Sequence, residues 1–164
     1  MRIDIRPAQI PDVEGMSRVV DSCWRENYKE IFTPGQIERY TGETRRNSFT
    51  KLLVDGKYIY ILLVDGEITA VCVGEFCEEK PFDGCVKILM LYVAPEKQHK
   101  GCGKKLLMHS LREMRKKGFK SAVLETAVDN VNARKFYERF GFEEQKFAAR
   151  NYDGVDYVTY KIVF

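Results

Sequence analysis

Three apolar runs in the middle of the chain constrain its fold more than any other feature. They cover residues 57–64 (KYIYILLV), 67–76 (EITAVCVGEF) and 85–93 (CVKILMLYV). The first two runs flank Asp65 and Gly66, a dipeptide that favours a tight hairpin turn. The third is short and continuously apolar, which is typical of a buried strand rather than an amphipathic helix. The chain therefore needs a β-sheet at its centre.

Helical and extended patterns alternate on either side of these runs. Residues 3–7 predict a strand, residues 10–28 a helix, and a second helical stretch, interrupted at 33–35 and 41–43, runs to about residue 53. Farther on, residues 103–118 and 129–142 predict helices, and residues 120–128, 143–152 and 155–164 predict strands. The order is a strand, two helices, three strands, a helix, a strand, a helix and two strands. We therefore expect a mixed α/β fold in one domain, residues 1–164.

Composition and charge narrow the class of protein. A net charge of +3 gives no reason to expect a nucleic-acid partner, and the lysine-rich stretches are better explained as solvated helix surface. The first residues lack the apolar core of a signal peptide, and no run is long enough to cross a membrane. Five cysteines without a C-x-x-C pair, and only two histidines, do not predict a zinc site. We expect a cytoplasmic protein with neither a metal nor a membrane partner.

The segment EKQHKGCGKK, residues 96–105, predicts an anion-binding loop. Gly101 and Gly103 stand where a strand gives way to a helix, so free backbone N–H groups and the helix dipole meet there. The P-loop pattern fails because Lys105 stands where a serine or threonine is required. The dinucleotide-binding pattern fails because Leu106 replaces its third glycine. The remaining pattern is Gln98-x-x-Gly101-x-Gly103.

This pattern resembles the pyrophosphate-binding motif of the GNAT superfamily of N-acetyltransferases, which use acetyl-coenzyme A. Residues 91–107 resemble the central strand, loop and helix of that family almost without a gap. About thirty residues farther on, a second family pattern is matched by Asn130, Ala133, Tyr137, Gly141 and Phe142. The resemblance implies a mixed, mostly antiparallel twisted sheet of about seven strands flanked by about four helices. It also implies that the fourth and fifth strands splay apart.

The resemblance also implies a cofactor site. The backbone of Leu91, Tyr92 and Val93 would hold the pantetheine arm. The pyrophosphate would lie among the loop residues Gln98, His99, Lys100, Gly101, Cys102, Gly103 and Lys104. Asn130 would contact the cofactor, although it could equally serve only to cap its helix. Tyr137 would lie near the sulfur and act as the general acid, the alternative being an aromatic side chain packed among its neighbours.

The implied reaction is direct attack of a primary amine on the thioester in a ternary complex. Glu125 is the first candidate for the base that deprotonates the amine, Glu75 is a weaker one, and a water chain without an essential carboxylate is a third possibility. Cys102 lies beside the loop, but no acyl-enzyme is needed. The acceptor would be a small-molecule amine or a protein N-terminus. Trp24 and Tyr28 would either line its pocket or belong to the core.

Two other functions compete with this one. The chain could be a non-catalytic acyl-coenzyme A-binding or regulatory domain that keeps the cofactor fold. It could also be a nucleic-acid-binding module, a hypothesis that rests only on the lysine clusters. A homodimer is expected only because members of this family often form dimers.

Overall fold

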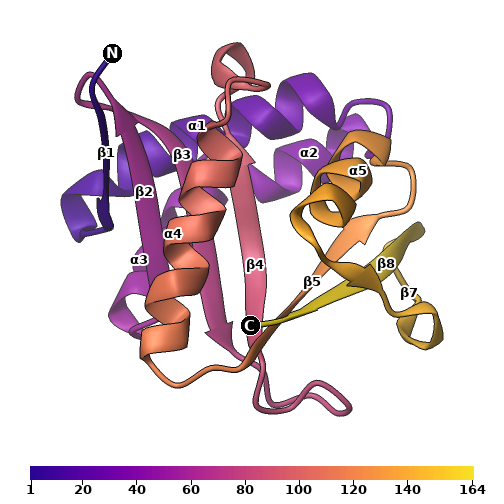
Figure 1. Ribbon diagram of the computed structural model, residues 1–164. Coiled ribbons are helices and arrows are strands. Elements are labelled where there is room, and N and C mark those ends of the chain that lie inside the picture. Colours follow the sequence, from indigo (N-terminus) through magenta and orange to yellow (C-terminus); the bar gives the residue numbers. More distant parts are fainter.

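The computed structural model describes residues 1–164 and contains one eight-stranded sheet with helices on both faces (Figure 1). The strands are β1 (Ile3–Pro7), β2 (Tyr58–Val64), β3 (Glu67–Phe76), β4 (Val86–Val93), β5 (Ser121–Ala127), β6 (Glu143–Glu144), β7 (Arg150–Tyr152) and β8 (Val155–Val163). The helices are α1 (Val13–Asn27), α2 (Pro34–Tyr40), α3 (Glu43–Val54), α4 (Cys102–Lys116) and α5 (Val131–Phe140). The strand order is β1-β2-β3-β4-β5-β8-β6, with β7 also paired to β8.

All neighbouring strands run antiparallel except β4 and β5, which are parallel. This arrangement confirms the predicted mixed, mostly antiparallel sheet. Helices α4 and α5 cover the face seen in front in Figure 1, while α1 and α3 pack behind it. Each face buries its own core, because successive strand residues point to opposite sides of the sheet. Leu106, Leu107 and Leu124 belong to the first core, and Met16, Phe49 and Val71 to the second.

The pairing of β4 with β5 ends early. It covers only Val86–Ile88 against Ala122–Leu124, although both strands continue beyond this point. Leu89 is an extra residue in β4, since Ile88 faces Gly74 and Met90 faces Val73 in the neighbouring β3. A bulge of this kind bends its strand and disturbs the ladder locally. The predicted splay between the fourth and fifth strands is therefore present.

Two details differ from the sequence-based expectation. The second helical stretch is two helices, because Thr33 begins α2 with a capping box and Gly42, at φ 71°, turns the chain before α3. Residues 143–152 are not one continuous strand. Both β6 and β7 pair with β8, but residues 145–149 face only Val158 and Thr159 and loop outward. The Thr159 hydroxyl donates to the Ala148 carbonyl at 3.0 Å and holds that loop in place.

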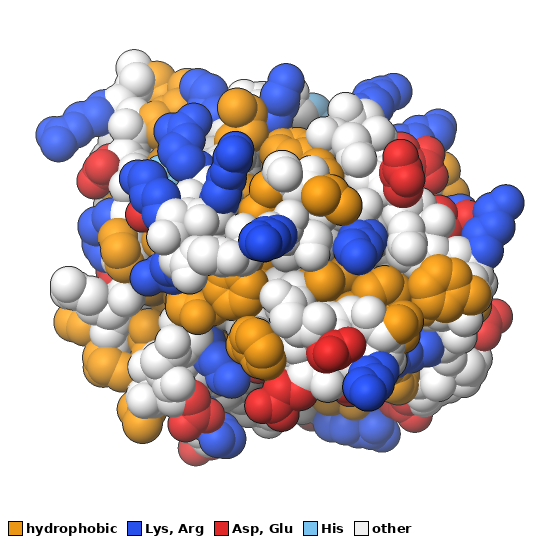
Figure 2. Space-filling model, turned by 60° about the horizontal axis from the view of Figure 1, so that its bottom comes forward, with side chains coloured by type: hydrophobic (Ala, Val, Ile, Leu, Met, Phe, Trp, Pro, Cys, Tyr) orange, Lys and Arg blue, Asp and Glu red, His pale blue; other side chains and the backbone are white.

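The surface carries charges of both signs. On the face shown in Figure 2, Lys and Arg side chains are interspersed with acidic and hydrophobic ones. No helix is long and apolar enough to span a bilayer. No cluster of three His, Cys, Asp or Glu side chains is arranged to hold a metal ion. All five cysteines are free thiols and all are buried.

Candidate active site

The splay between β4 and β5 opens a cavity of about 70 Å³. Its walls come from both separated strands, from the inner face of α5 and from the residue that follows α1. They are formed by Tyr28, Ile88, Leu89, Met90, Leu91, Tyr92, Leu124, Glu125, Thr126, Ala133 and Tyr137. Glu125 is the one charged side chain among them. We call this space the splay cavity.

Tyr137 reaches the splay cavity from α5. The Asn130 side chain caps this helix by accepting a hydrogen bond of 3.2 Å from the Ala133 amide, and Gly141 ends it in a left-handed conformation. The Tyr137 ring packs edge-on against Phe136 and Phe142, and only 8% of the residue is exposed. Burial raises the pKa of Tyr137 far above its usual value, with Cys72 and Tyr92 adding to the effect. The phenol is therefore fully protonated at neutral pH.

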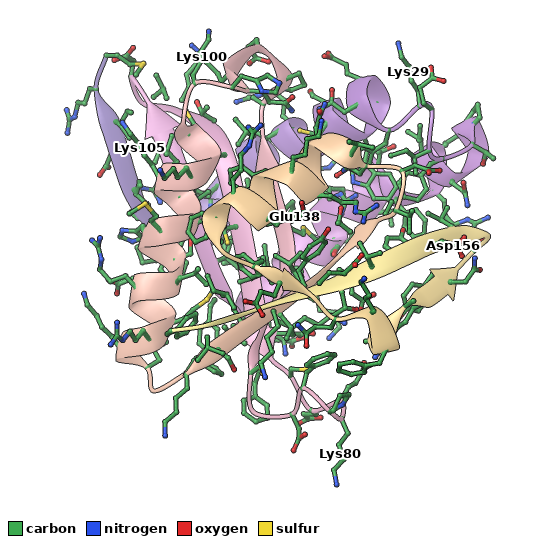
Figure 3. The ribbon with its side chains drawn as sticks, turned by 45° about the vertical axis from the view of Figure 1, so that its right-hand side comes forward. Lys29, Lys80, Lys100, Lys105, Glu138 and Asp156 are labelled. Atoms are coloured by element: carbon green, nitrogen blue, oxygen red, sulfur yellow. The ribbon has the colours of Figure 1, made fainter.

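A polar network fixes how α5 sits on β8. Arg134 donates to the Tyr160 hydroxyl at 3.1 Å, and that hydroxyl donates to the Glu138 carboxylate at 2.8 Å. Arg134 also bonds the Val128 carbonyl and the Glu144 carboxylate, each at 3.2 Å. Figure 3 shows Glu138 on the side of α5 that faces β8. Because Tyr137 lies between Arg134 and Glu138 in sequence, this network sets the position of its ring.

Glu125 lies on β5 opposite Thr159 of β8, and its side chain is 15% exposed. Lys87 of β4 approaches one carboxylate oxygen to 3.1 Å, and Arg150 of β7 lies 3.8 Å from the same oxygen. Glu75, the weaker candidate for the base, lies on β3, forms an ion pair of 3.1 Å with Lys57, and does not line the splay cavity. The structure therefore brings Glu125, and not Glu75, into one cavity with Tyr137.

The glycine-rich loop leads from β4 to α4. The first intrahelical bond of α4 runs from the Lys105 amide to the Gly101 carbonyl at 3.1 Å, so the amides of residues 102–104 precede the hydrogen-bonded ladder. Gly101 has φ 84° and His99 φ 61°, both left-handed. A Cβ on Gly103 would lie 3.3 Å from Val93 Cγ2, so this glycine permits close packing of α4 on the sheet. The N-terminal end of α4 thus offers donors to an anion.

The side chains of this loop fall into separate groups. Gln98 donates to the Val93 carbonyl at 3.0 Å and so ties the loop to the end of β4. Lys100 and Lys104 are exposed, and Cys102 is buried in the core. Lys100 and Lys105 extend at the end of the molecule opposite Lys80, which lies on the loop between β3 and β4 (Figure 3). Positive charge therefore surrounds the start of α4.

Two aromatic residues, Trp24 near the C-terminal end of α1 and Tyr28 just after it, lie close to Tyr92. Tyr28 lines the splay cavity, and its ring lies 6.0 Å from that of Tyr92. Trp24 does not line the cavity, but its indole N–H donates to the Tyr92 hydroxyl at 3.2 Å and its ring stacks on Phe32 at 4.7 Å. Of the two predicted aromatic candidates, the structure therefore brings only Tyr28 into the splay cavity.

Sequence reasoning missed three residues around this site. The sequence pattern assigns only the backbone of Tyr92, yet its side chain contacts both Trp24 and Tyr28. No sequence motif includes Lys87 or Arg150, although both contact Glu125. The alternation of β4 and β5 could have placed Lys87 near Glu125, whereas no local signal marks Arg150.

Comparison with known proteins gives the family. The model of the Acetyltransferase (GNAT) family matches residues 20–142. No curated protein sequence matches the chain. Among solved structures, PaiA N-acetyltransferase from Thermoplasma acidophilum, in complex with coenzyme A, is 24% identical with a TM-score of 0.80, and all of both chains is covered.

Two further solved structures share the fold. YncA from Salmonella typhimurium, a putative acetyltransferase with its cofactor acetyl-CoA, is 19% identical with a TM-score of 0.77 over 99% of this chain and 94% of that one. The ribosomal-protein-S18-alanine N-acetyltransferase from Escherichia coli is 18% identical with a TM-score of 0.72, with 99% and 94% covered. The family model spans most of the chain, and the fold agrees from end to end. The chain belongs to the acetyltransferase (GNAT) family.

Proposed function

We propose that this protein transfers the acetyl group of acetyl-coenzyme A to a primary amine, which attacks the thioester directly in a ternary complex. The observation that carries the proposal is that Tyr137 and Glu125 line the same cavity between β4 and β5. Solved structures of the same fold contain coenzyme A or acetyl-CoA, which supports the choice of acyl donor. The donor amides at the start of α4 suit the pyrophosphate, and the splayed part of β4, including Leu91, suits the pantetheine arm.

In this reaction the amine nitrogen forms a bond to the acetyl carbon, and the carbon–sulfur bond breaks. A lysine-like amine has a pKa near 10.4, so deprotonating it at pH 7 costs roughly 4 to 5 kcal/mol, whereas an α-amine near pKa 8 costs only about 1 to 1.5 kcal/mol. Glu125 accepts this proton. Tyr137 gives its own proton to the departing thiolate, because its buried phenol is still protonated at neutral pH.

The acceptor is a small-molecule amine or a protein N-terminus. The splay cavity suits the amine in its neutral form. Glu125 is the one charged residue that lines it, and that carboxylate already contacts two cations. Cys102 takes no part, because it is buried at the start of α4 within the core.

Two measurements test the proposal. Isothermal titration calorimetry with acetyl-coenzyme A should give saturable binding, and release of free thiol should depend on an added amine. Absence of binding at millimolar coenzyme A would sink the proposal. Binding without thiol release for any amine would instead favour a regulatory acyl-coenzyme A-binding domain. Salt-dependent retention on DNA would favour the nucleic-acid alternative.

A further inference from the structure

Four charged side chains from four separate segments meet beside the splay cavity. Lys87 of β4 lies 3.1 Å from Glu125 of β5, and Arg150 of β7 lies 3.8 Å from it. Arg150 also forms an ion pair of 2.9 Å with Glu79, on the loop between β3 and β4. We call these residues the charge network. It joins three strands and a loop around one carboxylate.

The cations of the charge network lie on the side of Glu125 that faces away from the splay cavity. A second, smaller cavity of about 10 Å³ is lined by Lys87, Arg150, Glu79 and Glu125 among others. Glu125 lines this cavity and the splay cavity, whereas Lys87 and Arg150 line only the smaller one. The two cations therefore hold the carboxylate from the side away from Tyr137. The splay cavity stays open to an incoming amine.

Lys87 has the stronger hold on Glu125. Its side chain is only 23% exposed, and burial by itself would lower its pKa, but attraction to Glu125 and Glu79 outweighs burial and leaves the pKa raised. Water screens a pair at this depth less than it screens a surface pair. Arg150 is shared, since it also donates to the Tyr152 hydroxyl at 2.8 Å and contacts Glu79 more closely than Glu125.

We infer that Lys87 is a positioning residue, which orients the Glu125 carboxylate toward the splay cavity and keeps it ready to accept a proton. This inference rests on the proposed role of Glu125 as base. Removing a cation from within about 4 Å of a carboxylate favours the protonated form. The enzyme without Lys87 would therefore need a higher pH to reach full activity.

The other groups that face Glu125 do not replace Lys87. Thr159 faces it from β8, Tyr28 and Tyr137 line the splay cavity with it, and Tyr157 of β8 lies near enough for the charge of Glu125 to raise the pKa of its phenol. Tyr157 and Tyr28 are neutral at the pH of the assay, since burial raises the pKa of Tyr157 to about 12 and that of Tyr28 well above its usual value. Glu79 is anionic and draws Arg150 away. Lys87 is thus the one cation committed to Glu125.

The test is the pH profile of kcat/KM for thiol release in Lys87→Met, with Lys87→Gln as a second variant should the first fold poorly. We expect the acidic limb to move up by about one pH unit, so that activity on that limb falls about tenfold while activity at high pH changes little. Lys87→Arg should restore the wild-type profile. The affinity for coenzyme A should not change, because Lys87 does not line the splay cavity.

Lys57→Met is the matched control, since it removes an ion pair of the same length, 3.1 Å, away from the splay cavity. A profile of Lys87→Met that superimposes on wild type, or a shift that Lys57→Met reproduces, overturns the inference. Carbon-13 NMR titration of the glutamate carboxyls gives a readout independent of turnover. An inactive wild type defeats the proposed function, whereas the carboxyl titration still decides whether Lys87 acts electrostatically on Glu125.

Discussion

The Nε atom of Arg134 donates a hydrogen bond of 3.1 Å to the hydroxyl of Tyr160, a side chain with no exposed surface. This bond joins α5 to β8 across the core. The same hydroxyl donates to Glu138, one turn farther along α5. The helix that carries Tyr137 is therefore fixed in rotation by polar contacts on either side of that residue.

Tyr160→Phe should destabilise the protein by about 1 to 3 kcal/mol, because it leaves the Arg134 guanidinium without one of its partners. Turnover should fall as well, since α5 gains freedom to rotate and Tyr137 moves with it. Urea unfolding and thiol release measure the two effects. Tyr58→Phe is the control, as the Tyr58 hydroxyl makes no hydrogen bond and its ring contacts Phe119 edge-on. Equal effects of both substitutions would contradict the role of the hydrogen bond.

Tyr137→Phe should lower turnover at least about tenfold, because general acid catalysis contributes on the order of a hundredfold or more. The affinity for coenzyme A and the unfolding midpoint should stay close to wild type, since the ring is kept and packs as before against Phe142 and Tyr160. Calorimetry and single-turnover kinetics separate binding from chemistry. Unchanged turnover would remove Tyr137 from the mechanism.

Gly103→Ala should weaken coenzyme A binding by roughly tenfold, about 1.4 kcal/mol. The new Cβ would lie 3.3 Å from Val93 Cγ2 and 3.7 Å from the Phe136 ring, so either the Val93 side chain or the start of α4 must move by a few tenths of an ångström. It would also occupy space that a bare backbone leaves to an anion. Gly35→Ala in α2 has no atom within 4 Å of its new Cβ and serves as the control. Wild-type affinity in Gly103→Ala would show that the anion lies elsewhere.

Cys102→Ala should keep turnover within a factor of about three, because direct attack by the amine needs no thiol nucleophile. Thiol release measures this. Loss of all activity in a folded Cys102→Ala protein would point to an acyl-enzyme.

Burial raises the pKa of Cys23 to about 12 and that of Cys72 to about 12. At pH 8 about one thiol in ten thousand is then a thiolate, so iodoacetamide should leave both unmodified in the folded protein. Mass spectrometry of labelled peptides checks this.

Asp12 makes stability depend on pH. Arg6 bonds both of its carboxylate oxygens, at 2.8 and 2.9 Å, and the Gln9 amide adds a third bond. The hydrogen bond from Arg6, more than any other contact, lowers the pKa of Asp12. The stabilisation is therefore present above the unfolded pKa of about 3.9 and is lost as pH falls through the lower folded value.

Asp12→Asn should cost about 1 kcal/mol at pH 7, a modest value because the Arg6 side chain is 38% exposed. The deficit should shrink below about pH 4 as the wild-type carboxyl becomes protonated. Urea unfolding at several pH values measures this difference. Glu14→Gln is the control, because the Glu14 side chain is 77% exposed. A deficit that stays constant down to pH 2 would assign the effect to packing.

Much of the fold was predictable because it depends on neighbours in sequence. The hairpin at Asp65 and Gly66, the cap at Asn130 and the end of α5 at Gly141 are set by local backbone chemistry, and each lies where the pattern placed it. The prediction of one strand over residues 143–152 is wrong because the path of these residues depends on how β8 pairs with them. A period-two pattern carries no information on which partner residues are skipped.

The sequence alone determined the central strands, the resemblance to the family, and the combination of a glycine-rich loop with a tyrosine on the second helix after it, because these are recorded in spacing along the chain. Only the tertiary structure decided which acidic side chain shares a cavity with Tyr137 and which cations hold it. Glu125 and Glu75 both stand on predicted strands, and the pairing of β4 with β5 ends early, next to the bulge at Leu89, only beside Glu125. Contacts such as that of Arg150 with Glu125 join residues far apart in sequence, so no local sequence pattern predicts them.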